Sequence, residues 1–272
     1  MVFMATKIIE LEKPKLKNPI LIEGLPGVGN VGKLAANYLI EELKAKKFAE
    51  LYSSHFMPFV LPRSEGDVHV LNNEFYYWKA KKKGQRDIII LVGDSQSVDS
   101  EGHYEIVEEI LKFAEKYEVK EILTLAGLGI GENKEHPEVI GVVNDKALLK
   151  KYKKYKINFP GGDTVGTLVG AAGLLIGLGK HHGMDGMCIM GETSGVPLIP
   201  DSKSADAILK VLADILKVDI DTENIAKKVQ EMENLIKRME DIKRKTVMQM
   251  LKQQMSEGQK SGDDDQELSY IG

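Results

Sequence analysis

Residues 19–43 read PILIEGLPGVGNVGKLAANYLIEEL, and this stretch indicates the class of fold. Residues 19–23 form an apolar run with the length of a short buried strand. A glycine-rich turn follows, and from Val31 to Leu43 apolar side chains recur at helical spacing. A strand that leads through a tight turn into a helix is the repeating unit of α/β folds, so we expect a fold of that class.

The same alternation continues along the chain. Apolar runs predict further strands at 48–56, 74–79, 87–92, 121–126, 138–143 and 187–190. Helical periodicity predicts helices at 103–117 and 201–216, and Asp201 is suited to cap the second of them. Residues 165–178 are rich in Gly and Ala and apolar on all sides, which predicts a closely packed helix there. Strands that alternate with helices predict a largely parallel sheet with helices on both faces, here within residues 1–220.

A long amphipathic helix is predicted at residues 221–255, because residues 223–255 contain neither Gly nor Pro. Its apolar stripe is formed by Ile225, Val229, Met232, Ile236 and Met239. Such a stripe is poorly stable in water without a partner. We expect this helical arm either to cover its own domain or to join copies of the chain, and we favour a homo-oligomer.

Residues 256–272 form a small, polar and acidic segment of the composition that remains disordered. The chain then ends in an apolar group, Leu268-Ser269-Tyr270-Ile271-Gly272. We therefore expect a flexible acidic tail that presents an apolar terminus.

The glycine-rich turn matches two phosphate-binding motifs in part. Gly27, Gly29 and Gly32 fit the dinucleotide pattern G-x-G-x-x-G, but the end of the next predicted strand, residues 51–56, has no acidic residue for the ribose. The same segment resembles a nucleotide-binding P-loop, but Leu34 stands where Ser or Thr would bind magnesium. We favour a structural strand-to-helix turn, and the alternative is an anion cradle for a nucleoside or phosphate ligand.

Other polar residues are weaker candidates for a site. Asp94 and His103 follow a predicted strand and could serve in acid–base chemistry, although helix capping explains this region as well. The neighbouring His181 and His182 point in different directions, so we expect a helix end rather than a metal site. The basic segment 146–156 is best interpreted as a solvated helix face.

Composition limits the functional classes further. The net charge of −4 gives no reason to expect nucleic acid as a partner. Cys188 is the single cysteine, which excludes a disulfide within the chain, and its apolar neighbours favour a buried core residue over a nucleophile. No segment has the length and apolarity of a signal peptide or membrane helix, so we expect a cytoplasmic protein.

Several segments, taken in order, resemble the PAC2 family, which includes the proteasome-assembly chaperones of eukaryotes and their archaeal homologues. These segments are residues 19–43, LVGDSQ at 91–96, TLAGLGIGE at 124–132, the Gly/Ala-rich residues 162–179, and GETSGVPLIPDSKSADAIL at 191–209. The resemblance implies an α/β core related to the phosphorylase/hydrolase-like fold without that fold's catalysis. It implies neither cofactor nor metal.

The resemblance also implies partners. These are the α-subunits of the 20S proteasome and further copies of the chain, in a dimer or a larger oligomer such as a tetramer. Proteasome-binding members of the family end in a hydrophobic residue, Tyr and any residue, and the Tyr and terminal carboxylate dock between α-subunits. Here Tyr270 is third from the end instead of second. The expected docking residues are Leu268, Tyr270, Ile271 and Gly272, and the expected function is that of an assembly factor or activator.

Overall fold

The computed structural model describes residues 5–132, 134–161, 165–196 and 200–221. The chain divides into two compact units, Met1–Ala226 and Lys227–Gly272. Every described residue belongs to the first unit. The predicted arm beyond Asp221 and the predicted acidic tail lie outside the described residues.

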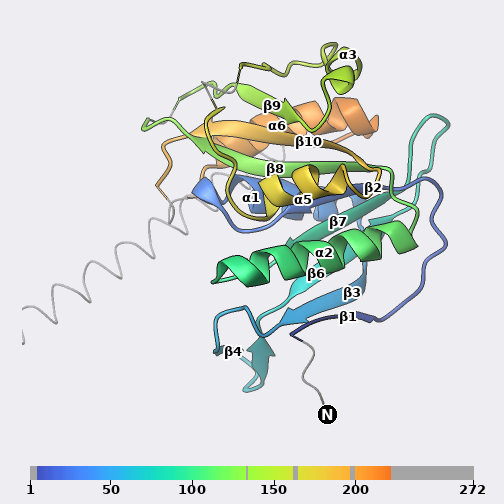
Figure 1. The fold of residues 1–272 in the computed structure, drawn as a ribbon, viewed down its shortest axis with the longest axis vertical. Helices are drawn as coiled ribbons and strands as arrows, with labels where there is room; N and C mark the ends of the chain where they lie inside the picture. The colour runs from blue at the N-terminus through green and yellow to red at the C-terminus, as the bar shows by residue number, and fades with distance from the viewer. Residues whose placement is uncertain (1–4, 133, 162–164, 197–199, 222–272) are drawn as a thin grey trace, which may run out of the picture. The chain divides into compact units, whose positions relative to one another are not determined.

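The described chain forms one eight-stranded sheet, in the order β1-β3-β6-β7-β2-β8-β10-β9 (Figure 1). Its strands are β1 (Thr6–Glu10), β2 (Ile20–Gly24), β3 (Lys46–Ser53), β6 (Asn73–Trp78), β7 (Ile88–Gly93), β8 (Glu121–Gly129), β9 (Val139–Val143) and β10 (Asp185–Thr193). The central strands β7, β2, β8 and β10 are parallel, as the alternation of strands and helices predicts. Antiparallel pairs extend the sheet on both sides, so the whole sheet is mixed.

Helices cover both faces of the sheet, which confirms the predicted α/β class. The helices α1 (Val31–Leu43) and α6 (Ser202–Leu216) pack together on one face, and α2 (Ser100–Lys116) and α5 (Ala171–Gly179) pack together on the other (Figure 1). Every residue of β2 and of β7 is buried. This burial explains their continuous apolar sequences, because a parallel strand covered on both faces has no solvent side to alternate with.

Local sequence signals fix the start of two helices. The Asp99 carboxylate accepts a hydrogen bond from Gly102 N at 2.7 Å at the start of α2. The Asp201 carboxylate accepts one from Ser204 N at 3.0 Å at the start of α6. Each bond satisfies a backbone donor that the first turn of a helix leaves unpaired.

Several boundaries differ from the sequence prediction, including the following two. The predicted helix 165–178 begins only at Ala171, because Gly170 has the non-helical angles φ +81 and ψ −162. The predicted strand 121–126 is longer than expected, since β8 continues to Gly129 by pairing with β10. The segment after β9 contains a 3₁₀ turn, η2 (Lys146–Leu148), and the short helix α3 (Leu149–Tyr152).

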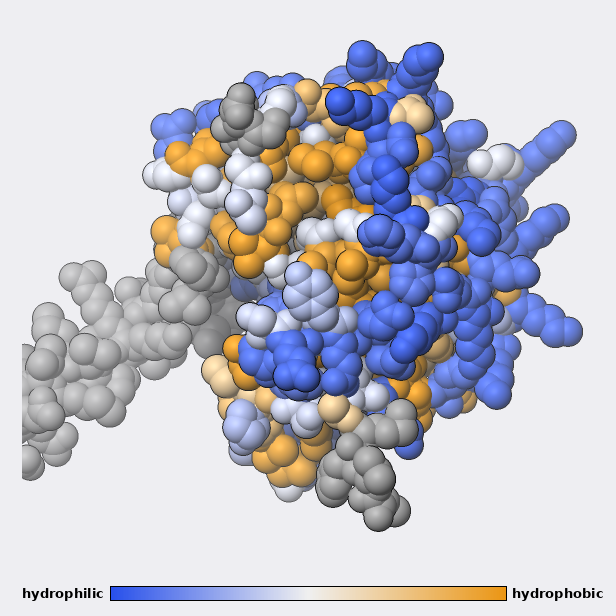
Figure 2. Space-filling model, viewed as in Figure 1, coloured by the Kyte–Doolittle hydropathy of each residue, from blue (hydrophilic) through white to orange (hydrophobic). Residues whose placement is uncertain are grey.

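A separate hairpin of β4 (Val60–Pro62) and β5 (Val68–Val70) was not predicted. It projects beyond the antiparallel side of the sheet (Figure 1). Six apolar side chains on and beside it are at least 44% exposed, namely Met57, Phe59, Val60, Leu61, Val68 and Val70. Figure 2 shows hydrophobic residues gathered at this end of the molecule and over α5, with hydrophilic residues over α2. Among the described residues, no helix is both long and apolar enough to cross a membrane.

Candidate functional site at the carboxyl ends of the parallel strands

A cleft of about 560 Å³ lies at the carboxyl ends of β2 and β8. We call it the strand-end cleft. One wall is the glycine-rich turn, which contains the 3₁₀ turn η1 (Val28–Asn30), and another is the segment 167–170 before α5. The end of β8, from Leu125 to Gly129, also lines it. Its volume lies within the range of small-molecule sites in proteins.

The acidic side chain in this cleft is Glu23, at the end of β2, and it is 1% exposed. Its Oε1 atom accepts a hydrogen bond from Leu25 N at 2.9 Å. Its Oε2 atom is also buried and has no hydrogen-bond partner among the described residues. Burial raises the pKa of Glu23 to about 7, because a charged carboxylate loses its hydration in the interior and one backbone hydrogen bond offsets only part of that loss.

The glycines of the turn allow helix α1 to lie directly on β8. Gly29 adopts φ +59, and a Cβ atom on Gly32 would lie 2.1 Å from the carbonyl oxygen of Leu125. A Cβ atom on Gly127 would lie 2.3 Å from the carbonyl oxygen of Val28. At Gly27, by contrast, a Cβ atom would meet nothing within 4 Å. The positive φ of Gly29 and the close packing of Gly32 thus account for these two glycines, and Gly27 faces the open cleft.

Gln96, from the loop after β7, connects two walls of the cleft. Its Nε2 atom donates to the Pro26 carbonyl at 2.6 Å. Its Oε1 atom accepts from Ala171 N, the first residue of α5, at 2.9 Å. The side-chain amide therefore holds the glycine-rich turn and the start of α5 at a fixed separation. Sequence reasoning missed this role, because both partners are more than 65 residues away.

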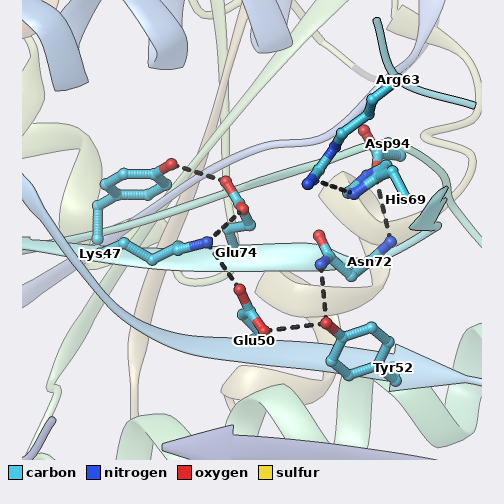
Figure 3. Close-up of polar contacts among 9 residues, drawn as sticks. Lys47, Glu50, Tyr52, Arg63, His69, Asn72, Glu74 and Asp94 are labelled. Carbon is cyan, nitrogen blue, oxygen red and sulfur yellow. Dashed lines mark hydrogen bonds and ion pairs between the residues drawn. The ribbon is translucent and has the colours of Figure 1, made fainter. Parts of the chain in front are cut away.

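The two acid–base candidates of the sequence lie in different surroundings. His103 lines the cleft, whereas Asp94 is not among the described residues that do. Asp94 belongs to a polar network on the antiparallel side of the sheet, shown in Figure 3. Its carboxylate lies 2.6 Å from His69 Nε2 and accepts from Asn72 N at 3.2 Å. His69 in turn contacts Arg63 at 2.9 Å.

The same network contains a pair of glutamates that the sequence did not single out. Glu50 in β3 lies directly opposite Glu74 in β6. Lys47 Nζ bridges them at 2.7 and 3.0 Å, as Figure 3 shows. The hydrogen bond from Lys47 lowers the pKa of Glu50. Like charges opposite each other destabilise a strand pair, so the lysine offsets a local cost.

Two further candidates from the sequence, His182 and Cys188, take part in packing or in contacts between helices. His182 contacts Glu115 at 2.8 Å and Glu108 at 3.2 Å, both in α2, and these hydrogen bonds raise the pKa of its imidazole. His182 thus joins the end of α5 to α2, and among the described residues no group of three His, Cys, Asp or Glu side chains is arranged to hold a metal ion. Cys188 is buried in β10.

The basic segment 146–156 is anchored to the sheet at Glu121. Lys151 Nζ donates to the buried Glu121 of β8 at 2.6 Å, and the Tyr152 hydroxyl donates to it at 2.5 Å. Tyr152 is itself buried. The segment is therefore an anchored cap on the strand, and only part of it is a solvated surface.

Comparison with known proteins places this fold and its glycine-rich turn in a family. Residues 21–240 match the model of the PAC2 family. The chain belongs to the PAC2 family. The match includes the strand-end cleft and all central strands of the sheet.

Several known proteins are similar to this chain over most of their length. Pyrococcus furiosus PbaB, described as an archaeal proteasome activator, is 42% identical, with 87% of this chain and 99% of PbaB covered and a TM-score of 0.80. Pyrococcus furiosus PbaA, described as an archaeal homolog of proteasome-assembly chaperone, is 28% identical, with 87% and 96% covered and a TM-score of 0.70. An uncharacterized protein of Methanocaldococcus jannaschii is 35% identical over 100% of this chain and 99% of its own.

Proposed function

We propose that this PAC2 protein binds the α-ring of the 20S proteasome, as an assembly factor or activator, and acts through protein contacts instead of catalysis. The observation that carries the proposal is the 42% identity to PbaB over nearly the whole PbaB chain. PbaA, described as a homolog of a proteasome-assembly chaperone, supports the same class of function. A fold by itself does not define a function, so the proposal depends on this identity in addition to the TM-score.

The proposed contact is the apolar terminus formed by Leu268, Tyr270, Ile271 and Gly272, which lies outside the described residues. Tyr270 would supply an aromatic anchor, and the terminal carboxylate would pair with a cation on the α-ring. The acidic, glycine-containing segment before it is suited to a flexible linker. Several such tails on one homo-oligomer would raise the affinity through effective concentration.

Deletion of residues 268–272 tests the tail. We expect the shortened chain to keep its thermal unfolding midpoint and to lose binding to immobilised 20S proteasome in surface plasmon resonance. Tyr270→Phe, which keeps the ring, should retain more binding than Tyr270→Ala. Undiminished binding by the deleted chain would contradict the tail contact and would leave the α/β domain as the binding surface.

Two further measurements distinguish an activator from an assembly factor. An activator that opens the α-ring gate should raise the hydrolysis of a short fluorogenic peptide by mature 20S proteasome. An assembly factor should instead bind free α-subunits and change their assembly state in native mass spectrometry. The tail deletion serves as the control in both experiments, because it should abolish either effect.

A phosphate ligand at the glycine-rich turn is a weaker second candidate. The described residues that line the strand-end cleft include Glu23 and neither Lys nor Arg. An anion there would meet a carboxylate without a compensating cation, which is unfavourable at low dielectric. The geometry therefore does not favour a nucleotide phosphate at Gly27–Gly32.

A further inference from the structure

The strand-end cleft lies where the connections of two neighbouring parallel strands diverge. Strand β2 leads into α1 on one face of the sheet, whereas β8 leads through β9 and α3 to α5 on the other face (Figure 1). Diverging connections leave a crevice between the carboxyl ends of the two strands. In open α/β sheets this crevice is the usual place for a ligand.

Glu23 places an unsatisfied polar atom beside this crevice. It lines the cleft, it is 1% exposed, and its Oε2 atom lacks a hydrogen-bond partner among the described residues. Leaving a buried polar atom unpaired costs about 1–3 kcal/mol, and more if the group is charged. A bound molecule that donates a hydrogen bond to Oε2 would recover that cost.

The surroundings of Glu23 supply little positive charge. Among the described residues, His103 lines the cleft from α2, and the buried Cys188 of β10 lies close enough to Glu23 to feel its charge. Burial raises the pKa of Cys188 to about 12, and the charge of Glu23 adds to this rise. The cysteine is therefore a neutral neighbour at physiological pH.

The rest of the lining is largely apolar. Leu25, Leu125 and Met190 line the cleft beside Glu23. Among the described lining residues Glu23 is the one carboxylate, and apolar walls around it favour a ligand with an apolar body and one positively charged or hydrogen-bond-donating end.

We propose that the strand-end cleft binds a small organic cation, with an ammonium or amidinium group at Glu23 Oε2 and an apolar body against Leu25, Leu125 and Met190. The site is separate from the proposed tail contact, so it holds whether or not the chain binds the proteasome. Such a ligand would connect the sheet with the glycine-rich turn and α5, which Gln96 already joins to each other.

Three probes of nearly equal size and different charge test the proposal by isothermal titration calorimetry on the full chain. Benzamidine is a cation, benzamide is neutral and benzoate is an anion. We expect benzamidine to bind, benzamide to bind about tenfold more weakly or worse, and benzoate not to bind. Benzamidine affinity should rise between pH 6 and pH 8, because the cation selects the ionised carboxylate.

Glu23→Gln removes the charge and keeps the shape and the acceptor for Leu25 N. Glu65→Gln, at an exposed position, makes the same change in net charge away from the cleft. We expect the Glu23 variant to lose benzamidine binding and the Glu65 variant to keep it, with both folded by circular dichroism. The proposal is overturned if benzamidine fails to bind at millimolar concentration, if Glu23→Gln binds it equally well, or if benzamide or benzoate binds as tightly.

Discussion

Gly32 of α1 packs directly against the main-chain carbonyl of Leu125 in β8, so that a Cβ atom on Gly32 would lie 2.1 Å from the carbonyl oxygen. Two glycines of this short motif are therefore required for different physical reasons. Gly29 has a positive φ, whereas Gly32 has ordinary helical geometry and is constrained by its neighbour.

Gly32→Ala should destabilise the protein by about 3 kcal/mol, because α1 must move away from β8 to admit the methyl group. The gain in helix propensity, about 1 kcal/mol, offsets only part of this cost. Gly27→Ala is the matched control, since its Cβ would meet nothing within 4 Å and its φ is −161. Urea unfolding measures both. Equal stabilities of the two variants would show that α1 shifts freely over the sheet.

Glu121→Gln should cost about 3 kcal/mol at neutral pH, because it removes the charge on which a buried network converges. Glu121 accepts hydrogen bonds from Arg86, Lys151 and Tyr152. Burial alone would raise its pKa, but the hydrogen bonds and charges of these partners lower it overall. Its contribution is thus present above the ordinary glutamate pKa and is lost as the pH falls through the lowered value.

Urea unfolding at several pH values checks this prediction. The stability difference between Glu121→Gln and the wild type should be largest near pH 7 and should shrink under acid conditions. Asp219→Asn is the control, since its partner Lys82 and Asp219 itself are both exposed. Exposed pairs contribute little to stability. A difference that does not depend on pH would assign the effect to packing instead of charge.

The Glu23→Gln variant should become more stable than the wild type as the pH rises. The folded pKa of about 7 lies above the ordinary value of 4.5, so the wild type loses stability between these two pH values. The loss amounts to about 3 kcal/mol at most, at 1.36 kcal/mol for each pKa unit. The variant and the wild type should be similarly stable near pH 4.5 and should diverge by pH 8 in thermal or urea unfolding. A constant difference across this range would contradict a raised pKa at Glu23.

Truncation after Asp221 should lower the oligomer mass in size-exclusion chromatography with light scattering. The expected reason is loss of the predicted apolar stripe formed by Ile225, Val229, Met232, Ile236 and Met239. Each such side chain contributes about 1.5–3 kcal/mol when fully buried. Truncation after Met255 removes only the acidic tail and should leave the number of chains per oligomer unchanged.

The alternative outcome is informative as well. The described residues up to Asp221 contain the complete eight-stranded sheet, so the truncated chain should remain folded. If it keeps the full oligomer state, the contact lies on the α/β domain. The exposed apolar side chains of the β4–β5 hairpin would then be the first surface to examine.

Short-range patterns in the sequence determined much of the fold. Helical spacing predicted α1 with both of its ends, and Asp201 was identified as the cap of α6. Apolar runs predicted the central strands, because a buried parallel strand requires them. These features depend on residues within a few positions of one another, and a single sequence contains that information.

Only the tertiary structure decided which distant residues meet. The start of α5 depends on Gly170 and on Gln96, which lies 75 residues from its partner Ala171. The length of β8 depends on its pairing with β10, and the exposed hairpin has no local pattern that predicted it. Sequence alone showed Glu23 as one acid in an apolar strand. Its burial, its unpaired oxygen and its place in the cleft arise from β8, the glycine-rich turn and the segment before α5, because solvation and hydrogen bonding depend on neighbours in space.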